Sequence, residues 1–435
     1  MELAAMTAAA PTARRQDAAF RIGSYVVNIC LGLAHVGLTS RLLGPSEVGI
    51  YALGLLVVQP LMDFFNTGLY WTALRCSPVE YAALGGRVRA ASLAVAVLAA
   101  ALAFLYVKPL VLLFLAPCVY LAAIEGYQTG HQFKELRFTF QAVRSTLILL
   151  VNLVCSYALA LAGLGAASLS AGLALSILAG ILVSRFWHRE SAAMDAAAPL
   201  EPKLVREFAL TGFSRSIGNL SANTAGWALG LFSTSALLGA FNRALRMSDV
   251  QLSIYNAAIG GMVAPVMAKR GAWSAAEYWA SVRRASYFAA ALAIPGCLLA
   301  PLAIPLLLGP GWEAAVRVTQ VLLCGSVFRN INRITDDYLR HHGSIRFAAC
   351  FTPAFALVSF LCFSGMLFAG VSLTAIAFAH VAFLAAAWLV KLAWLSSPWS
   401  SGDGAGVGRG SEWIRVSWLA TLAAQMFLLA YYAAA

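Results

Sequence analysis

The chain has 435 residues, of which 61% are hydrophobic and only 11% are charged. Soluble domains carry about 45–50% apolar and about 25% charged residues, so no soluble core would bury this much apolar surface. A helix needs about 20 apolar residues to cross a bilayer, and the sequence offers thirteen such stretches with short connections. The composition predicts an all-α polytopic membrane protein and excludes a sizeable soluble domain.

The predicted helices fall into two sets of six and a final extra one. In chain order they span 22–40, 48–69, 90–107, 109–127, 140–162, 166–187, 208–231, 235–266, 285–308, 314–338, 346–369, 372–396 and 416–434. The corresponding units are an N-terminal six-helix lobe (1–187), a cytoplasmic linker (188–203), a C-terminal six-helix lobe (204–396), and a cytoplasmic loop with an additional transmembrane helix (397–435).

A short internal repeat supports this division. Thr39–Gly44 (TSRLLG) ends the first predicted helix, and Thr234–Gly239 (TSALLG) is predicted to end the seventh. Because six is an even number, both lobes would enter the membrane from the same side. The sequence therefore predicts parallel rather than inverted repeats.

Basic residues set the expected orientation. Most Lys and Arg residues lie in the N-terminal segment and in connections that follow even-numbered helices, whereas the other connections carry almost none. By the positive-inside rule the N-terminus faces the cytoplasm. Residues 1–20 contain no apolar stretch before Arg14, so we expect no cleavable signal peptide and assign targeting to the first helix.

Several classes of function find no support in the residues. The net charge of +12 is spread along loops without a basic domain, which argues against nucleic acid. The eight cysteines form no CxxC pair and the histidines no cluster, so we expect no metal and no cofactor. No HExxH, GxSxG or P-loop motif occurs. An enzyme such as a polyprenyl-phosphate glycan polymerase or transferase remains an alternative, although the outward connections are short.

The most informative residues are charged side chains inside apolar helices. A charge at mid-bilayer is costly and must face a cavity, a partner or the interface. Because a guanidinium binds phosphate oxygens through two parallel hydrogen bonds, a cavity lined by arginine suits a large phosphate-bearing anion. Snorkelling, or pairing such as Arg246 with Asp249, is the open alternative. Arg215 and Arg243 are the stronger candidates. The candidate substrate-binding residues are Arg144, Arg215, Arg243, Arg246 and Arg329.

The run Arg41–Leu53 (RLLGPSEVGIYAL) resembles the helix 1–2 signature of Wzx-type polysaccharide flippases, in the multidrug/oligosaccharidyl-lipid/polysaccharide exporter superfamily. Shorter matches follow in the family's order at Gly68–Arg75, Glu135–Phe138, Asn242–Met247, Ala264–Pro265 and Leu307–Trp312. The resemblance implies two six-helix lobes around a central cavity. It also implies that polyprenyl-diphosphate-linked oligosaccharide crosses the bacterial inner membrane by alternating access, for exopolysaccharide, O-antigen or capsule biosynthesis. Partners would include the lipid bilayer, a polymerase and other assembly proteins.

Two positions depart from the family pattern. An acidic residue that often precedes Gly68 is absent, and the Asn-x-Asp-like element of the seventh helix reads Asn223-Thr-Ala225. Both departures count against a carboxylate site that couples transport to a cation, for which Asp63 and Glu125 are the remaining candidates. A multidrug extruder of the same superfamily is a second alternative, but it would need buried carboxylates for cationic drugs, and this interior is richer in arginine.

Overall fold

A computed structural model describes residues 11–73, 76–105, 108–135, 138–187, 201–255, 273–342 and 345–395, in which every regular element is a helix. The helices are α2 (Pro11–Ala73), α3 (Pro78–Ala101), η1 (Leu102–Leu105), α4 (Pro109–Lys134), α5 (Phe138–Leu161), α6 (Ala166–Trp187), α7 (Pro202–Ala222), α8 (Thr224–Phe232), α9 (Ser235–Tyr255), α11 (Ala275–Leu308), α12 (Glu313–His341), α13 (Ile345–Phe368) and α14 (Leu373–Leu395). Eight of these are long and apolar enough to span a bilayer. The predicted all-α membrane fold is confirmed; the thirteenth predicted helix lies outside the described residues.

Several predicted boundaries differ from the structure, and two of them have clear local reasons. The third helix begins at Pro78 instead of residue 90, because Ser77 and Glu80 form a capping box that starts the helix there. The next turns of this helix carry buried residues, among them the small residues Ala82, Ala83 and Gly85. The seventh helix is divided at Asn223, where the backbone leaves the helical conformation between α7 and α8. Hydropathy alone detects neither feature.

The first two predicted helices form one element, α2, with a sharp break at Gly44. Gly44 has φ 68° and ψ 171°, and Pro45 follows it. A side chain at this φ would be strained, and proline cannot donate the hydrogen bond that would continue the helix. The break turns the chain back at one end of the bundle. We call this the Gly44 end; the turn at Ser233 and the turn at Gly309–Gly311 lie there too.

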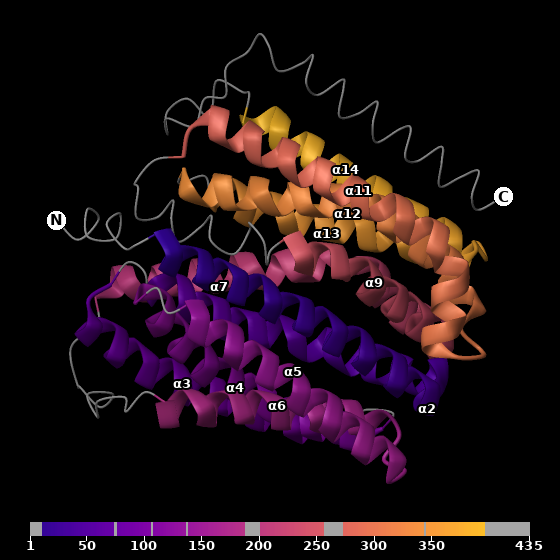
Figure 1. The fold of residues 1–435 in the computed structure, drawn as a ribbon, viewed down its shortest axis with the longest axis horizontal. Coiled ribbons are helices and arrows are strands. Elements are labelled where there is room, and N and C mark those ends of the chain that lie inside the picture. The colour runs from indigo at the N-terminus through magenta and orange to yellow at the C-terminus, as the bar shows by residue number, and fades with distance from the viewer. Residues whose placement is uncertain are drawn as a thin grey trace.

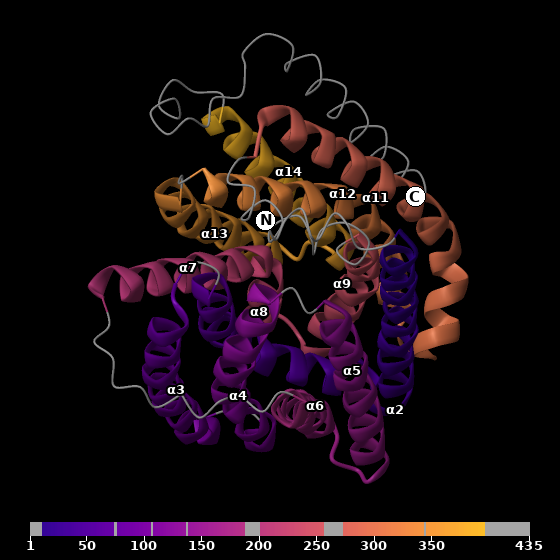
Figure 2. The same ribbon diagram turned by 60° about the vertical axis from the view of Figure 1, so that its left-hand side comes forward.

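The helices form two lobes. Figure 1 shows α3, α4, α5 and α6 on one side and α11, α12, α13 and α14 on the other, with α2, α7 and α9 between them. Figure 2 shows the same division from a second direction. One hydrophobic cluster joins α2, α3, α4 and α6 and also takes in Leu204 and Phe208 of α7, and a second lies within α11, α12 and α14. Two further clusters join α2 to helices of the C-terminal lobe, so the lobes also share apolar contacts. The exact domain boundaries stay a prediction.

At the Gly44 end the two lobes make direct backbone contact. A Cβ atom on Gly49 would overlap the carbonyl oxygen of Ser235, and one on Gly239 would overlap that of Pro45. Each glycine thus packs on the residue four positions before the other glycine. This reciprocal contact is what two repeats related by a two-fold axis would make.

The same contact corrects the expected role of the sequence repeat. Thr39–Gly44 does end the first half of α2, but Thr234–Gly239 begins α9 instead of ending the preceding helix. The structural counterparts are the segments that begin at Pro45 and Ser235, linked by a 2.8 Å hydrogen bond between the hydroxyls of Ser46 and Ser235. The two similar sequence segments lie 195 residues apart, whereas the structurally equivalent positions Gly49 and Gly239 lie 190 residues apart. The sequence repeat is therefore offset by five residues from the structural one.

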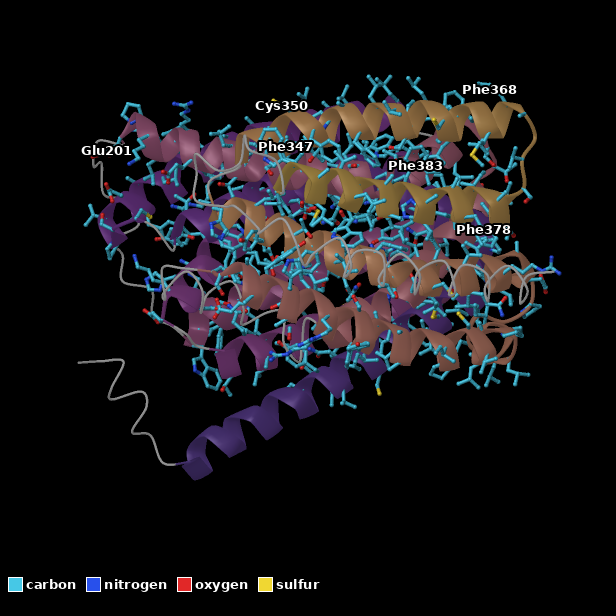
Figure 3. All side chains as sticks on the ribbon, turned by 90° about the horizontal axis from the view of Figure 1, so that it is seen from above. Glu201, Phe347, Cys350, Phe368, Phe378 and Phe383 are labelled. Carbon is cyan, nitrogen blue, oxygen red and sulfur yellow. The ribbon has the colours of Figure 1, made fainter. Side chains whose placement is uncertain are left out.

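Hydrogen bonds to main-chain oxygens reinforce the Gly44 end. Arg41 donates from Nε to the carbonyl oxygen of Leu307 at 3.1 Å and from Nη2 to that of Leu306. The indole of Trp312 donates to the carbonyl oxygen of Ser40 at 3.3 Å. The first turns of α2, indigo in Figure 3, instead project away from the other helices. The lobes are thus fastened at the Gly44 end.

We predict that Gly49→Ala loosens this end. Overpacking costs about 1–3 kcal/mol in protein interiors, and here the obstacle is a backbone carbonyl that cannot rotate away. In a Ser46→Cys/Ser235→Cys background, oxidation should join the two lobes, and Gly49→Ala should lower the crosslinked fraction at least about fivefold. Gly365→Ala is the matched control, because a Cβ there has nothing within 4 Å. Equal crosslinking with and without Gly49→Ala would contradict the close-contact interpretation.

Candidate functional site

A cavity of about 530 Å³ lies between the lobes, lined by residues of α2, α5, α6 and α9. Two of the sequence-predicted arginines line it, Arg243 and Arg246, one turn apart on α9. Arg243 is 3% exposed; its Nη2 donates to Thr39 Oγ1 at 3.1 Å, and its Nε has no partner among the described residues. Arg246 is exposed. We call this space the interlobe cavity.

A second cavity, of about 360 Å³, lies in the C-terminal lobe and is lined by residues of α7, α8, α9, α12, α13 and α14. Arg215 and Arg329, both predicted from the sequence, line this C-lobe cavity, as does Arg333. Arg215 is half-buried, and no carboxylate of the described residues lies within ion-pair distance of it. Four of the five candidate arginines therefore reach one of the two cavities.

The two cavities share one residue, Asp249, which lines both. Its carboxylate pairs with Arg329 Nη1, and the same nitrogen lies 3.5 Å from Ser248 Oγ. The sequence leaves a pairing of Arg246 with Asp249 open. In the structure the ion pair of Asp249 is made with Arg329 of α12, the helix that faces it. Arg246 is thereby left on the side of the interlobe cavity.

Sequence reasoning missed Lys391, which lines the C-lobe cavity from α14. Its Nζ lies 2.7 Å from Asp336 Oδ1 and 3.0 Å from Asn332 Oδ1, and the residue is 7% exposed. Phe383 of the same helix, labelled in Figure 3, also lines this cavity. The signal was present, because Lys391 stands alone in the apolar run AWLVKLAWL.

Arg144 lies in the N-terminal lobe and is not among the residues that line either cavity. Its guanidinium donates to Glu125 Oε1 at 3.0 Å, to the carbonyl oxygen of Gly180 at 3.1 Å and to Thr129 Oγ1 at 3.3 Å. These bonds tie α5 to α4 and α6. The geometry favours the structural pairing that the sequence left open for Arg144, and it places Glu125 in an ion pair.

Asp63 links the lobes through neutral amides. Its Oδ1 accepts from Gln59 Nε2 at 2.9 Å, and its Oδ2 accepts from Asn219 Nδ2 of α7. Asn219 in turn accepts from Asn223 Nδ2, at the break between α7 and α8. Asn223, the first residue of the Asn223-Thr-Ala225 element, therefore belongs to the same network as Asp63.

The two cavities together are strongly basic. Six lining residues are basic (Arg215, Arg243, Arg246, Arg329, Arg333 and Lys391) and two are acidic (Asp249 and Asp336). The described residues contain no group of three or more metal-ligating side chains. Such a lining can hold an anion larger than a single phosphate, because guanidinium forks on different helices can bind separate oxygens.

We predict that the Arg144–Glu125 pair supports stability. Their side chains are 4% and 20% exposed, and removing one partner of a buried pair typically costs about 3–5 kcal/mol. Arg144→Met should lower the Tm in detergent, and adding Glu125→Gln should restore part of the loss by removing the stranded charge. Arg284→Met, at an exposed position of α11, is the control. A double variant as unstable as the sum of its singles would show that the pair is not coupled.

Comparison with known proteins agrees with this fold. The family described as "Polysaccharide biosynthesis protein" matches residues 38–317. The lipid II flippase MurJ in an inward closed conformation is similar in structure, with a TM-score of 0.66, 12% identity, and coverage of 94% of this chain and 97% of that chain. No curated protein sequence matches significantly.

Two further solved structures share the fold. An inward-facing multidrug resistance MATE family transporter of the MOP superfamily has a TM-score of 0.61 and 14% identity, covering 89% of this chain and 99% of its own. A MOP superfamily transporter from Pyrococcus furiosus, described as having a reverse polarity of its binding pocket, has a TM-score of 0.54 and 15% identity, covering 87% of this chain and 93% of its own. The chain belongs to the polysaccharide biosynthesis protein family and has the fold of the MOP-superfamily transporters.

Proposed function

We propose that this protein moves polyprenyl-diphosphate-linked oligosaccharide across the cytoplasmic membrane by alternating access, for polysaccharide biosynthesis. The observation that carries the proposal is the basic lining of two neighbouring cavities between and within the lobes. Arg215, Arg243 and Arg246 are in no ion pair among the described residues, and of the three Arg215 and Arg243 are the more buried. The family and the similarity to a lipid II flippase support a lipid-linked substrate.

The arrangement of the lobes supports loading from the cytoplasmic leaflet. The Gly44 end holds the connections poor in Lys and Arg, and from the positive-inside rule we infer that this end faces outside and the N-terminus faces the cytoplasm. The lobes are fastened at that outer end by Ser46–Ser235 and Arg41, and farther along α2 they are also joined by Ser216–Pro60 and Asn219–Asp63. In the proposed cycle the α2–α7 contacts open to admit an anionic headgroup from the inside, and the outer contacts open to release it.

The two rival functions fit the cavities less well. A multidrug extruder for cationic compounds needs an available carboxylate, whereas Asp249 and Asp336 are paired with Arg329 and Lys391. A polymerase or transferase needs a nucleophile or an acid–base pair beside its substrate. The cavities do contain carboxylates and histidines, but Asp249 and Asp336 are held in ion pairs with Arg329 and Lys391. His35 and His380 line different cavities. Binding of a cationic dye in preference to polyprenyl diphosphate would favour the extruder.

We predict that Arg215 and Arg243 act as phosphate ligands. Arg→Ala at either position should abolish polysaccharide export at matched protein levels and weaken binding of polyprenyl diphosphate in detergent. Each charge-assisted hydrogen bond contributes about 1.5–3 kcal/mol, which corresponds to a roughly tenfold or larger loss of affinity. Arg→Lys should rescue only in part, because an ammonium keeps the charge but not the paired donors.

Arg284→Ala is the matched control for these variants, since that arginine is exposed on α11 and lines neither cavity. It should leave export and binding unchanged. If lysine substitutes fully at both positions, the arginines act only by long stems that reach lipid headgroups. That result, or normal export by both alanine variants, would contradict the phosphate-ligand proposal. The assignment of the fold would not be affected.

A second prediction concerns coupling to a cation. Asp63 has only neutral amide partners among the described residues, so protonating it breaks no ion pair, whereas protonating Glu125 would cost its contact with Arg144. We therefore expect Asp63→Asn to remove the response of transport to an imposed pH gradient in proteoliposomes. Glu125→Gln should keep it. A gradient response that survives in Asp63→Asn would leave the membrane potential as the simpler driving force.

A further inference from the structure

The two walls of the interlobe cavity differ in chemistry. The α9 wall carries Arg243 and Arg246 together with Asp249, which is paired with Arg329, whereas the wall formed by α2 and α5 carries polar side chains without a carboxylate or guanidinium. The polar residues on that second wall are Tyr25, Asn28, His35, Tyr51, Gln59, Ser145 and Asn152. A diphosphate carries its charge at one end of the headgroup and its sugars at the other. Complementarity therefore orients the headgroup across the cavity.

The hydrogen bonds of Asn28 fix which of its atoms is available. Ser145 Oγ donates its proton to the carbonyl oxygen of Ala142 at 2.9 Å, so this hydroxyl accepts from Asn28 Nδ2 at 3.0 Å. The opposite amide orientation would place two acceptors together. Asn28 Oδ1 is left without a partner among the described residues and is covered by protein atoms, so a ligand donor reaches it when the Asn28 side chain turns toward the cavity that it lines. An orphaned buried acceptor costs free energy and calls for a donor.

Neighbouring amides on this wall are held in the same way. Gln59 donates from Nε2 to Asp63, and this bond leaves Oε1 of Gln59 as the accepting atom of that amide. Asn152 Oδ1 accepts from Ser156 Oγ at 3.1 Å, which leaves Nδ2 as a donor. The wall thus presents acceptors and a donor together. A phosphate oxygen offers only acceptors at neutral pH, whereas a sugar hydroxyl or acetamido group offers a donor and an acceptor at once.

We propose that the α2–α5 wall of the interlobe cavity is a sugar subsite, in which Asn28 Oδ1 accepts a hydrogen bond from the sugar next to the diphosphate. This proposal rests on the proposed function. It adds an assignment of the cavity wall that contacts the glycan. Asn28 is then a specificity residue, whereas Arg243 binds the part common to all polyprenyl diphosphates. A ligand that lacks a donor at this point leaves the acceptor orphaned, and the site discriminates against it.

The test compares two probes on the purified full-length protein: bare polyprenyl diphosphate and polyprenyl-diphosphate N-acetylglucosamine. A typical hydrogen bond is worth about 1 kcal/mol, so Asn28→Ala should weaken binding of the glycosylated probe roughly fivefold and leave the bare probe within about twofold. Arg243→Ala should weaken both. Size-exclusion profiles and Tm values establish that each variant is folded, and Asn152→Ala gives an independent change on the same wall with the same expected selectivity.

Each outcome decides the matter. An equal loss for both probes in Asn28→Ala and Asn152→Ala would make these residues structural, and no loss for either probe would remove them from the site. If the unaltered protein binds both probes equally, the sugar subsite is overturned while the transport proposal stands. If it binds neither probe, the proposed function itself fails.

Discussion

The close approach of Gly49 and Gly239 to the opposite backbone is the contact on which the arrangement of the lobes depends. Two helices can approach this closely only where both lack a side chain at the crossing, which is why small residues recur where membrane helices meet. Because the crossing lies at the Gly44 end, the lobes meet tightly there, and the interlobe cavity lies between α2, α5 and α9. The Gly44 break and the hydrogen bonds of Arg41 hold the same end.

The charged interior divides into pairs that stabilise the fold and cations left for a ligand. Glu125 with Arg144, Asp249 with Arg329 and Asp336 with Lys391 each satisfy two charges within the protein. Arg215 and Arg243 lie outside these pairs. A low-dielectric interior retains an unpaired cation only at a cost. This free-energy cost is consistent with a site that binds an anion. It argues against a merely structural role for both arginines.

Much of this fold could be predicted from the sequence, because bilayer thickness forces apolar stretches of fixed length. The candidate arginines were found for the same reason: a charge inside an apolar helix stands out. Which partner each charge takes could not be predicted. Arg246 and Asp249 are neighbours along one helix, yet Asp249 pairs with α12, and this choice depends on how two helices distant in sequence face each other. Asn28 gave no signal, since an amide is unremarkable until its neighbours are known.

The hydrogen bonds that Arg41 and Trp312 donate across the lobes end on main-chain oxygens of Leu306, Leu307 and Ser40. Every amino acid has such an oxygen, so the accepting positions are free to drift in identity without loss of the contact. Contacts are often detected in aligned sequences by correlated substitutions of the two residues. These contacts between the lobes would therefore produce no such correlation. The donors would appear as two independently restricted positions, and the lobe junction they hold would be invisible to any method that looks for residues changing together.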